Sequence, residues 1–287
     1  MDTDLLRTFL EVNKTRHFGR AATNLYLTQS AVSFRIRQLE IKLGTSVFTR
    51  KRGDLRLTAA GERFVPYAES ILQTWGRARQ DVALTDSYQQ QLTVGATSLI
   101  WEIDNSSEWL EQVEAIQPEW ALRTESLSRQ QISNALLEKQ VDVVLTSEPP
   151  KLADLQQVRL TDFNLVLVSS EPEQTMETIG ALPLVYLDWG TRFSVEHSRI
   201  PSLQRTPVLH SHGCQPATKF LLNRGGVGYL PSTIAQPWID AGKLHLVEDS
   251  PAMENELFMV WLSGNEKHED INSLVDAFTE QAVHDFG

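Results

Sequence analysis

The stretch Gly19–Gly44, GRAATNLYLTQSAVSFRIRQLEIKLG, decides the fold of the N-terminal region. It reads as two short helices joined by a turn. The first is rich in alanine, and Thr28 is suited to begin the second, because its hydroxyl can accept a hydrogen bond from a free amide of the first turn. In the second helix, apolar residues recur at spacings of four, three and four, which indicates one buried face. These residues are Val32, Ile36, Leu39 and Leu43.

The opposite face of the second helix carries short polar side chains, one aromatic ring and two guanidinium groups. Two helices of this kind form a helix-turn-helix, which lays its second helix in the major groove of double-stranded DNA. Arg and Gln make bidentate contacts with base edges, and Ser and Thr reach phosphates or bases. The candidate DNA-binding residues on this helix are Thr28, Gln29, Ser30, Ser33, Phe34, Arg35, Arg37 and Gln38.

A basic hairpin is predicted after Gly44. Two short extended pieces flank Gly53 and Asp54, which is the pattern of a β-hairpin wing. The alternative is a solvated basic loop, but next to a helix-turn-helix we favour a wing that meets phosphates or a minor groove. Its candidate DNA-binding residues are Arg50, Lys51 and Arg52.

Thr58 is suited to begin a long helix in which apolar residues alternate at spacings of four and three. This heptad pattern is typical of a two-helix coiled coil and predicts a homodimer, since DNA readers of this type bind paired half-sites. The alternative is that the same face packs on its own domain. The candidate dimerisation residues are Phe64, Ala68, Ile71, Trp75, Ala78 and Val82.

The charge of the chain is unevenly distributed. The net charge of −11 taken alone argues against DNA binding. However, residues 1–88 hold 14 Lys and Arg against 9 Asp and Glu, a net +5, whereas the rest holds 12 against 28, a net −16. A basic module on an acidic body concentrates the electrostatic footprint for DNA in one place.

The chain has 287 residues and an ordinary apolar content. This length and composition fit a protein of two or three domains. No apolar run reaches the length of a membrane span, and the N-terminus lacks the layout of a signal peptide. The one cysteine, Cys214, excludes an internal disulfide and suits a reducing cytoplasm. We therefore expect a cytoplasmic protein with no membrane partner, in which Cys214 is a plain small residue rather than a redox thiol.

From Leu92 onward, strand patterns alternate with helix patterns in two series, the second beginning near Leu182. Such alternation predicts an α/β fold with parallel sheets. We expect a winged helix-turn-helix at 1–58, a linker and dimerisation helix with a hinge at 59–90, and an α/β domain at 91–287. Within that last domain, one subdomain takes 91–162 with 257–287, and the other takes 163–256.

A ligand site is expected beyond the carboxyl ends of the strands, where ligands bind in open α/β folds. Hydroxyls and free amides at helix starts suit a small polar or weakly anionic metabolite, and tryptophan rings supply apolar walls. The alternative is ordinary capping and loop chemistry. The candidate effector-binding residues are Thr97, Ser98, Ser128, Thr146 and Trp189.

Other chemistries find little support in the sequence. His210, His212 and Cys214 lie close together, but they match no known zinc spacing. Nucleophile motifs and phosphate loops are absent, so we expect no metal, no cofactor and no enzymatic activity. A solute-binding α/β protein without catalytic activity is the main rival to a DNA-binding regulator, but the N-terminal module argues against it.

The N-terminal motifs together resemble the signature of LysR-type transcriptional regulators. They include the run from Thr28 to Ser33, Leu39-Glu40, Phe48 and Leu57-Thr58. Ser30 departs from a pattern that often has Pro, which is pre-organised at a first helical turn but not required there. The resemblance implies an effector-binding domain similar to periplasmic binding proteins, and a homodimer that assembles into a tetramer. The segments RHFGRAA and LTAAGE are similar to segments in repressors of flagellar genes within that family.

Overall fold

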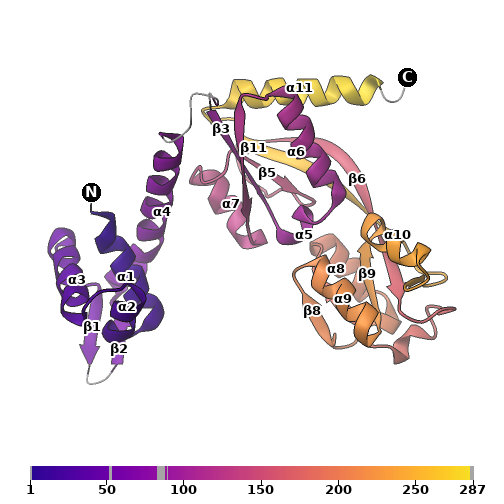
Figure 1. Ribbon diagram of the computed structural model, residues 1–287, viewed down its shortest axis with the longest axis horizontal. Helices are drawn as coiled ribbons and strands as arrows, with labels where there is room; N and C mark the ends of the chain where they lie inside the picture. The colour runs from indigo at the N-terminus through magenta and orange to yellow at the C-terminus, as the bar shows by residue number, and fades with distance from the viewer. Residues whose placement is uncertain (1, 52–53, 83–87, 89, 285–287) are drawn as a thin grey trace. The chain divides into compact units, whose positions relative to one another are not determined.

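A computed structural model describes residues 2–51, 54–82, 88 and 90–284, with the backbone alone for 50, 51, 54, 80, 81 and 277–284. The chain divides into two compact units, Met1–Leu84 and Thr85–Gly287, and each is described by itself. Figure 1 shows the helical first unit and the mixed second unit.

The first unit is built from helices around one small core, with a two-stranded hairpin at its edge (Figure 1). The ring of Phe9 is fully buried at the centre, 5.5 Å from Phe48 and 5.3 Å from Phe64 between ring centroids. This core joins elements from the whole length of the unit. They are α1 (Thr3–Thr15), α2 (Phe18–Asn24), α3 (Gln29–Leu43), β1 (Phe48–Lys51), β2 (Asp54–Leu57) and α4 (Ala59–Asp81).

Local signals in the sequence set the boundaries of these helices. The hydroxyl of Thr28 accepts from the backbone N–H of Ala31 at 3.2 Å and begins α3, and Thr58 does the same for Gly61 at 3.0 Å at the start of α4. Gly44 ends α3 in the left-handed conformation, with φ of 69°. The predicted hairpin is confirmed at the level of the backbone, since β1 and β2 pair antiparallel from Phe48 opposite Leu57.

The predicted seam along α4 divides into two parts. Phe64, Ala68 and Ile71 pack into the core of their own unit, and Ala68 is fully buried there. Further along, the side chains of Trp75 and Val82 are 46% and 88% exposed. The first half of the seam therefore follows the alternative interpretation, packing on its own domain, while the second half offers an apolar face to solvent.

The second unit is organised by a seven-stranded mixed sheet. Strands β3, β4 and β5 run parallel, as the alternating pattern predicts, but the late strand β11 returns antiparallel between β5 and β6. Its strands are β3 (Gln90–Ala96), β4 (Trp120–Ser126), β5 (Val143–Thr146), β6 (Leu155–Ser169), β9 (Val227–Pro231), β10 (His245–Leu246) and β11 (Met253–Leu262).

Two lobes lie along this sheet, joined by the long strand β6. The first part of β6 pairs with β11, and its last part, from Leu165 to Ser169, pairs with β9 (Figure 1). The first lobe holds β3–β5 with α5 (Ser98–Trp101), α6 (Asp104–Ile116), α7 (Arg129–Leu137) and α11 (His268–His284). The second lobe holds β9 and β10 with η1 (Ile179–Ala181), β7 (Val185–Leu187), α8 (Thr191–Ser198), η2 (Pro201–Leu203), β8 (Leu209–Ser211), α9 (Cys214–Arg224) and α10 (Ser232–Asp240).

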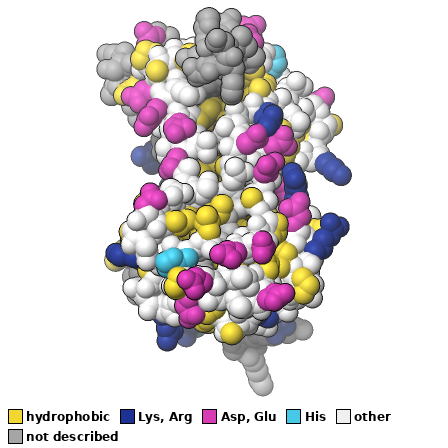
Figure 2. Space-filling model, turned by 90° about the vertical axis from the view of Figure 1, so that its right-hand side faces the viewer, with side chains coloured by type: hydrophobic (Ala, Val, Ile, Leu, Met, Phe, Trp, Pro, Cys, Tyr) yellow, Lys and Arg dark blue, Asp and Glu magenta, His cyan; other side chains and the backbone are white. Residues whose placement is uncertain are grey.

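Burial and surface charge follow the sequence pattern in this unit. Leu92, Leu145, Leu165 and Leu221 are fully buried in one core that runs through both lobes. Figure 2 shows acidic side chains, in magenta, spread over the face drawn, with basic ones mainly toward its edges. The acidic character expected for the body of the protein is therefore visible on this face.

Candidate nucleic-acid interface and ligand cleft

The outer face of α3 is the candidate surface for reading DNA. Along the helix, Ser30, Phe34 and Arg37 are exposed and follow one another at spacings of four and three, opposite the buried Val32 and Ile36. The ring of Phe34 is 57% exposed, which is unusual for a large apolar side chain on a polar face. Gln29 is exposed and Ser33 and Gln38 are half-buried beside this stripe, so these predicted residues share one accessible face.

Arg35 departs from the expected placement on that face. Its guanidinium group turns toward α1, where Nη2 lies 2.8 Å from Oδ2 of Asp4 and Nη1 donates to the hydroxyl of Thr8 at 3.4 Å. Position 35 is three residues after Val32 and four before Leu39, which places it at the edge of the buried stripe. In this structure Arg35 therefore joins α3 to α1 instead of standing on the outer face.

The remaining predicted DNA-binding residues lie at the cap of α3 and in the wing. Thr28 uses its hydroxyl as the cap of α3, and this hydroxyl also lies 2.9 Å from that of Ser30. In the wing, Arg52 and the side chains of Arg50 and Lys51 lie outside the described residues. The backbone of β1 nevertheless carries Arg50 and Lys51 on the hairpin.

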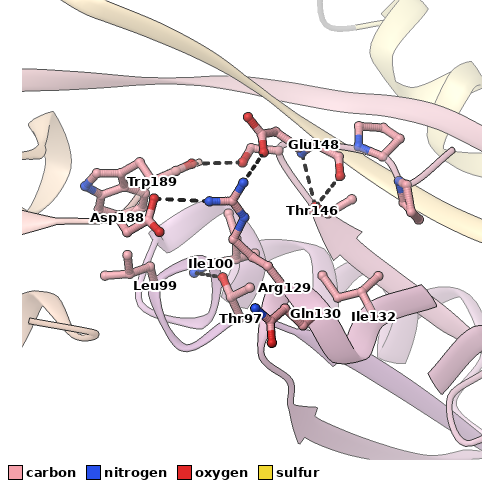
Figure 3. Close-up of a pocket in the computed structure, with 13 residues that line it drawn as sticks. Thr97, Leu99, Ile100, Arg129, Gln130, Ile132, Thr146, Glu148, Asp188 and Trp189 are labelled. Carbon is pink, nitrogen blue, oxygen red and sulfur yellow. Dashed lines mark hydrogen bonds and ion pairs between the residues drawn. The ribbon is translucent and has the colours of Figure 1, made fainter. Parts of the chain in front are cut away.

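The second unit contains a cleft between the two lobes. A cavity of about 490 Å³ is lined by Thr97, Thr146 and Trp189 together with Arg129 and Glu148. Ser98 and Ser128 line an adjoining hollow that shares Thr97 and Arg129. All five residues predicted from the strand ends therefore lie at one cleft, which Figure 3 shows in close-up for the first cavity.

The hydroxyls in this cleft also serve local structure. Thr97 accepts from the N–H of Ile100 at 3.4 Å, at the start of α5. The hydroxyl of Thr146 donates to the carbonyl of Glu148 at 3.2 Å and accepts from its N–H at 3.1 Å. Ser128 precedes α7, where its N–H donates to the side chain of Gln131 at 2.9 Å. The capping interpretation and the cleft-lining interpretation thus hold for the same residues.

A charged cluster that sequence reasoning missed occupies the centre of the cleft (Figure 3). Arg129, the first residue of α7, reaches from the first lobe toward the second and donates to Glu148 Oε2 at 2.7 Å, Asp188 Oδ1 at 3.1 Å and Thr191 Oγ1 at 2.8 Å. The available signal was an arginine directly after the predicted residue Ser128, at the carboxyl end of a strand.

Apolar groups complete the walls of this cavity. The ring of Trp189 is buried and packs 5.9 Å from that of Phe163 between centroids. Leu99, Ile100 and Ile132 lie on the side of the first lobe. A cavity with apolar walls and a few converging polar groups is the usual form of a small-molecule site.

Cys214 and the neighbouring histidines do not form a reactive centre in this structure. The thiol is fully buried at the first turn of α9, and burial, with the nearby Glu102, raises its pKa far above the ordinary value. Thiolate, the reactive form, is thus disfavoured. Within the described ranges, no group of three His, Cys, Asp or Glu side chains is arranged to hold a metal ion. The described helices include none long and apolar enough to cross a membrane.

Comparison with known proteins decides between the interpretations of this architecture. Residues 3–62 match the family described as bacterial regulatory helix-turn-helix protein, lysR family, and residues 85–283 match the LysR substrate binding domain. The chain belongs to the LysR family. It is a LysR-type transcriptional regulator, and the rival interpretation as a solute-binding protein is not favoured.

Relatives of this regulator are similar to it in sequence over nearly their whole length. The HTH-type transcriptional regulator HdfR of Yersinia enterocolitica is 39% identical over 284 residues, covering 96% of this chain and 95% of that protein. HdfR of Salmonella typhimurium is 40% identical over 286 residues, covering 98% and 100%. Among solved structures, the LysR family regulator CbnR has a TM-score of 0.69 at 16% identity, covering 98% and 97%, which shows the shared fold.

Proposed function

We propose that this LysR-type regulator binds double-stranded DNA in the cytoplasm as a homodimer that assembles into a tetramer, and that it represses its target genes. The observation that carries the proposal is the outer face of α3, where Ser30, Phe34 and Arg37 are accessible on a helix-turn-helix. The solved structure of CbnR with its target DNA supports DNA binding by this fold. Similarity to HdfR supports flagellar genes as the target class.

Within this interface we assign base reading to Gln29, Ser30, Ser33, Phe34 and Arg37, with Gln38 at the edge. Phe34 has the chemistry to contact the methyl group of thymine, and Arg37 to contact guanine or a phosphate. Thr28 holds the start of the helix, and the wing residues contact the backbone of DNA. Arg35, which pairs with Asp4, is assigned to holding α3 in position rather than to reading bases.

Genome-wide mapping of bound sites, followed by gel-shift competition against unrelated DNA, tests this function. We expect a shared motif with two half-sites, and binding to it that survives an excess of random duplex. Enrichment at flagellar promoters supports the target class, and its absence with a clear motif elsewhere refutes that part alone. Binding that random DNA removes equally well contradicts a sequence-specific regulator.

We further propose that the cleft between the lobes takes a small polar or weakly anionic metabolite, which changes the angle between the lobes and so the spacing of the DNA-binding modules. The cavity volume, its apolar walls and the hydroxyls of Ser98 and Thr146 support this assignment. A ligand shifts the equilibrium only by its differential affinity for the two arrangements.

The effector assignment is tested by exposing the protein to a panel of small carboxylic acids and amino acids, with unfolding temperature and operator binding as readouts. The double variant Ser98→Val, Thr146→Val should fold and bind DNA but lose the response to any compound that acts on the wild type. Thr206→Val, at an exposed position outside the cleft, is the matched control and should respond normally. A double variant that responds like the wild type contradicts the assignment.

A further inference from the structure

Two helices of the second lobe begin without a side-chain cap of their own. The residues before α8 and α9 are Gly190 and Gly213, and neither has a side chain that could supply an acceptor. The first four N–H groups of a helix have no partner within the helix, and they favour negative charge. The starts of α8 and α9 therefore need acceptors from elsewhere.

Carboxylates from the first lobe fill both places. The N–H of Arg192 in α8 donates to Oε1 of Glu148 at 2.8 Å, and the N–H of Gln215 in α9 donates to Oε2 of Glu102 at 2.9 Å. Glu148 follows β5 and Glu102 follows α5, so both belong to the lobe across the cleft. Each bond thus joins one lobe to the other through a charge-assisted cap.

The two glycines give these carboxylates the space they occupy. A Cβ added to Gly190 would lie 2.8 Å from the carboxyl carbon of Glu148, and a Cβ added to Gly213 would lie 2.7 Å from Oε1 of Glu102. Real Cβ atoms essentially never approach so closely. At both helix starts, the carboxylate therefore occupies the space that a side chain at the glycine position would need.

Arg129 reinforces the cap on α8. Its guanidinium group holds Glu148 at 2.7 Å and also reaches Asp188 of the second lobe (Figure 3). It further donates to Thr191, the first residue of α8. Nearby, the hydroxyl of Ser147 donates to the carbonyl of Trp189 at 3.4 Å. These contacts join the two lobes at the start of α8.

We propose that Glu148 and Glu102 are built-in latches, which hold the two lobes together by capping α8 and α9 from the opposite lobe. Opening the cleft uncaps both helices, so the two bonds favour the arrangement in which the lobes of the second unit are in contact. The inference rests on the proposed function only in taking the cleft as the effector site. An effector then acts by displacing a latch and releasing the lobes.

The variant Gly213→Ser separates the latch from helix stability. The backbone at Gly213 has φ of −149° and ψ of 144°, an extended conformation that serine adopts readily at a helix start. The new hydroxyl is expected to supply a cap for α9, while its Cβ would lie 2.7 Å from Oε1 of Glu102, so that this flexible carboxylate has to move. Gly180→Ser is the matched control, since an added Cβ there meets nothing within 4 Å.

The distance between the lobes is measured with spin labels on cysteines introduced at the exposed positions Asn134 of α7 and Lys219 of α9. Native Cys214 is fully buried, so the labels react with the introduced thiols. Labelled chains are diluted into an excess of unlabelled protein to suppress distances between chains. No DNA and no ligand is added, so the result is independent of whether the protein recognises an operator or an effector.

We expect a single narrow distance for the wild type and Gly180→Ser, and a shift to longer distances for Gly213→Ser with an unchanged unfolding temperature. Glu102→Ala and Glu148→Ala, which remove a carboxylate without adding an atom, should give the same shift. If the folded Gly213→Ser and Glu102→Ala proteins both keep the wild-type distance, the latch proposal is overturned. If Gly213→Ser does not fold, the two alanine variants decide the outcome.

Discussion

Arg35 and Arg37 lie two residues apart on α3 and have different partners. Arg37 is exposed, and its Nε donates only to the carbonyl of Ser33 at 3.3 Å among the contacts described, whereas Arg35 pairs with Asp4. We predict that Arg37→Ala weakens specific DNA binding by roughly 1–3 kcal/mol, the range for a lost base contact. Gel-shift titration with the mapped operator and with random duplex measures this loss.

Arg35→Ala should act on the fold instead. The Arg35 side chain is 28% exposed and that of Asp4 49%, so the ion pair contributes at most about 1 kcal/mol to stability. Thermal unfolding should show a small decrease shared by Asp4→Asn, which removes the same pair from the other side. Operator affinity in Arg35→Ala that falls as far as in Arg37→Ala, with no similar loss in Asp4→Asn, contradicts this division of roles.

His197 gives the second lobe a dependence on pH. Its ring is buried among Tyr186, Phe193 and Tyr229, with the Tyr186 ring at 5.0 Å between centroids, and burial lowers the pKa of His197. The unfolded chain takes up a proton near pH 6.5, but the folded chain does so only at lower pH. The contribution of neutral His197 to the free energy of unfolding is therefore fully present above about pH 6.5. It is lost as the pH falls through the pKa that His197 has in the folded chain.

We expect His197→Phe to flatten this dependence, so that the unfolding temperature decreases less between pH 7 and pH 5 than in the wild type. His212→Phe, at an exposed position, is the control and should follow the wild-type curve. A His197→Phe curve parallel to the wild type would show that other groups cause the acid sensitivity.

The placement of some site residues could be predicted from the sequence, and that of others could not. Thr97 and Trp189 could be placed at the cleft because strand ends are visible in the pattern. Arg129 could not, because the direction of a long side chain depends on partners such as Asp188, which lies 59 residues away. The edge position of Arg35, by contrast, was present in the spacing from Val32 to Leu39.

At the scale of elements, α4 changes role along its length. Ile71 packs into the core of the first unit, whereas Trp75 lies one turn further and is 46% exposed. We predict that Trp75→Ser weakens the homodimer by about 1.5–3 kcal/mol per protomer, the value for exposing one large apolar side chain. Sedimentation over a concentration series measures the dissociation constant.

Controls on the same helix separate association from folding. Gln73→Ser changes an exposed position on the opposite face and should leave the dimer intact. Ile71→Asp should unfold the first unit, because it places a charge in that core, and is therefore a poor probe of the interface. Wild-type association in Trp75→Ser would move the dimer contact elsewhere.

Elements as such were largely predictable. The helix-turn-helix, the hairpin and the alternating strands each follow from local periodicity and capping residues such as Thr28 and Thr58. The sequence did not show that β11 lies between β5 and β6 in the sheet. Pairing such as that between Val144 and Val260 joins distant parts of the chain, and local patterns do not reveal it. Local patterns thus specify elements better than they specify partners.

For the whole molecule, the segregation of charge predicts how DNA binding responds to salt. The wing lies in the region of net +5, and its phosphate contacts release counterions. We expect Lys51→Ala and Arg52→Ala to weaken binding to all sequences alike and to make the salt slope shallower by about one ion each. Lys219→Ala, in the acidic unit, is the control and should leave the slope unchanged. A collapse in discrimination between operator and random DNA would mean that the wing reads sequence.

The position of β11 has a consequence for synthesis of the protein. This strand lies between β5 and β6, yet it ends at Leu262, 116 residues after Thr146 at the end of β5. At the usual 5–20 residues/s, the ribosome needs on the order of ten seconds to supply it. During that interval the edges of β5 and β6 that β11 later covers stay unpaired, which invites aggregation. We therefore expect the nascent second unit to be most exposed to aggregation before β11 is made, while the first unit, already synthesised, can fold ahead of it.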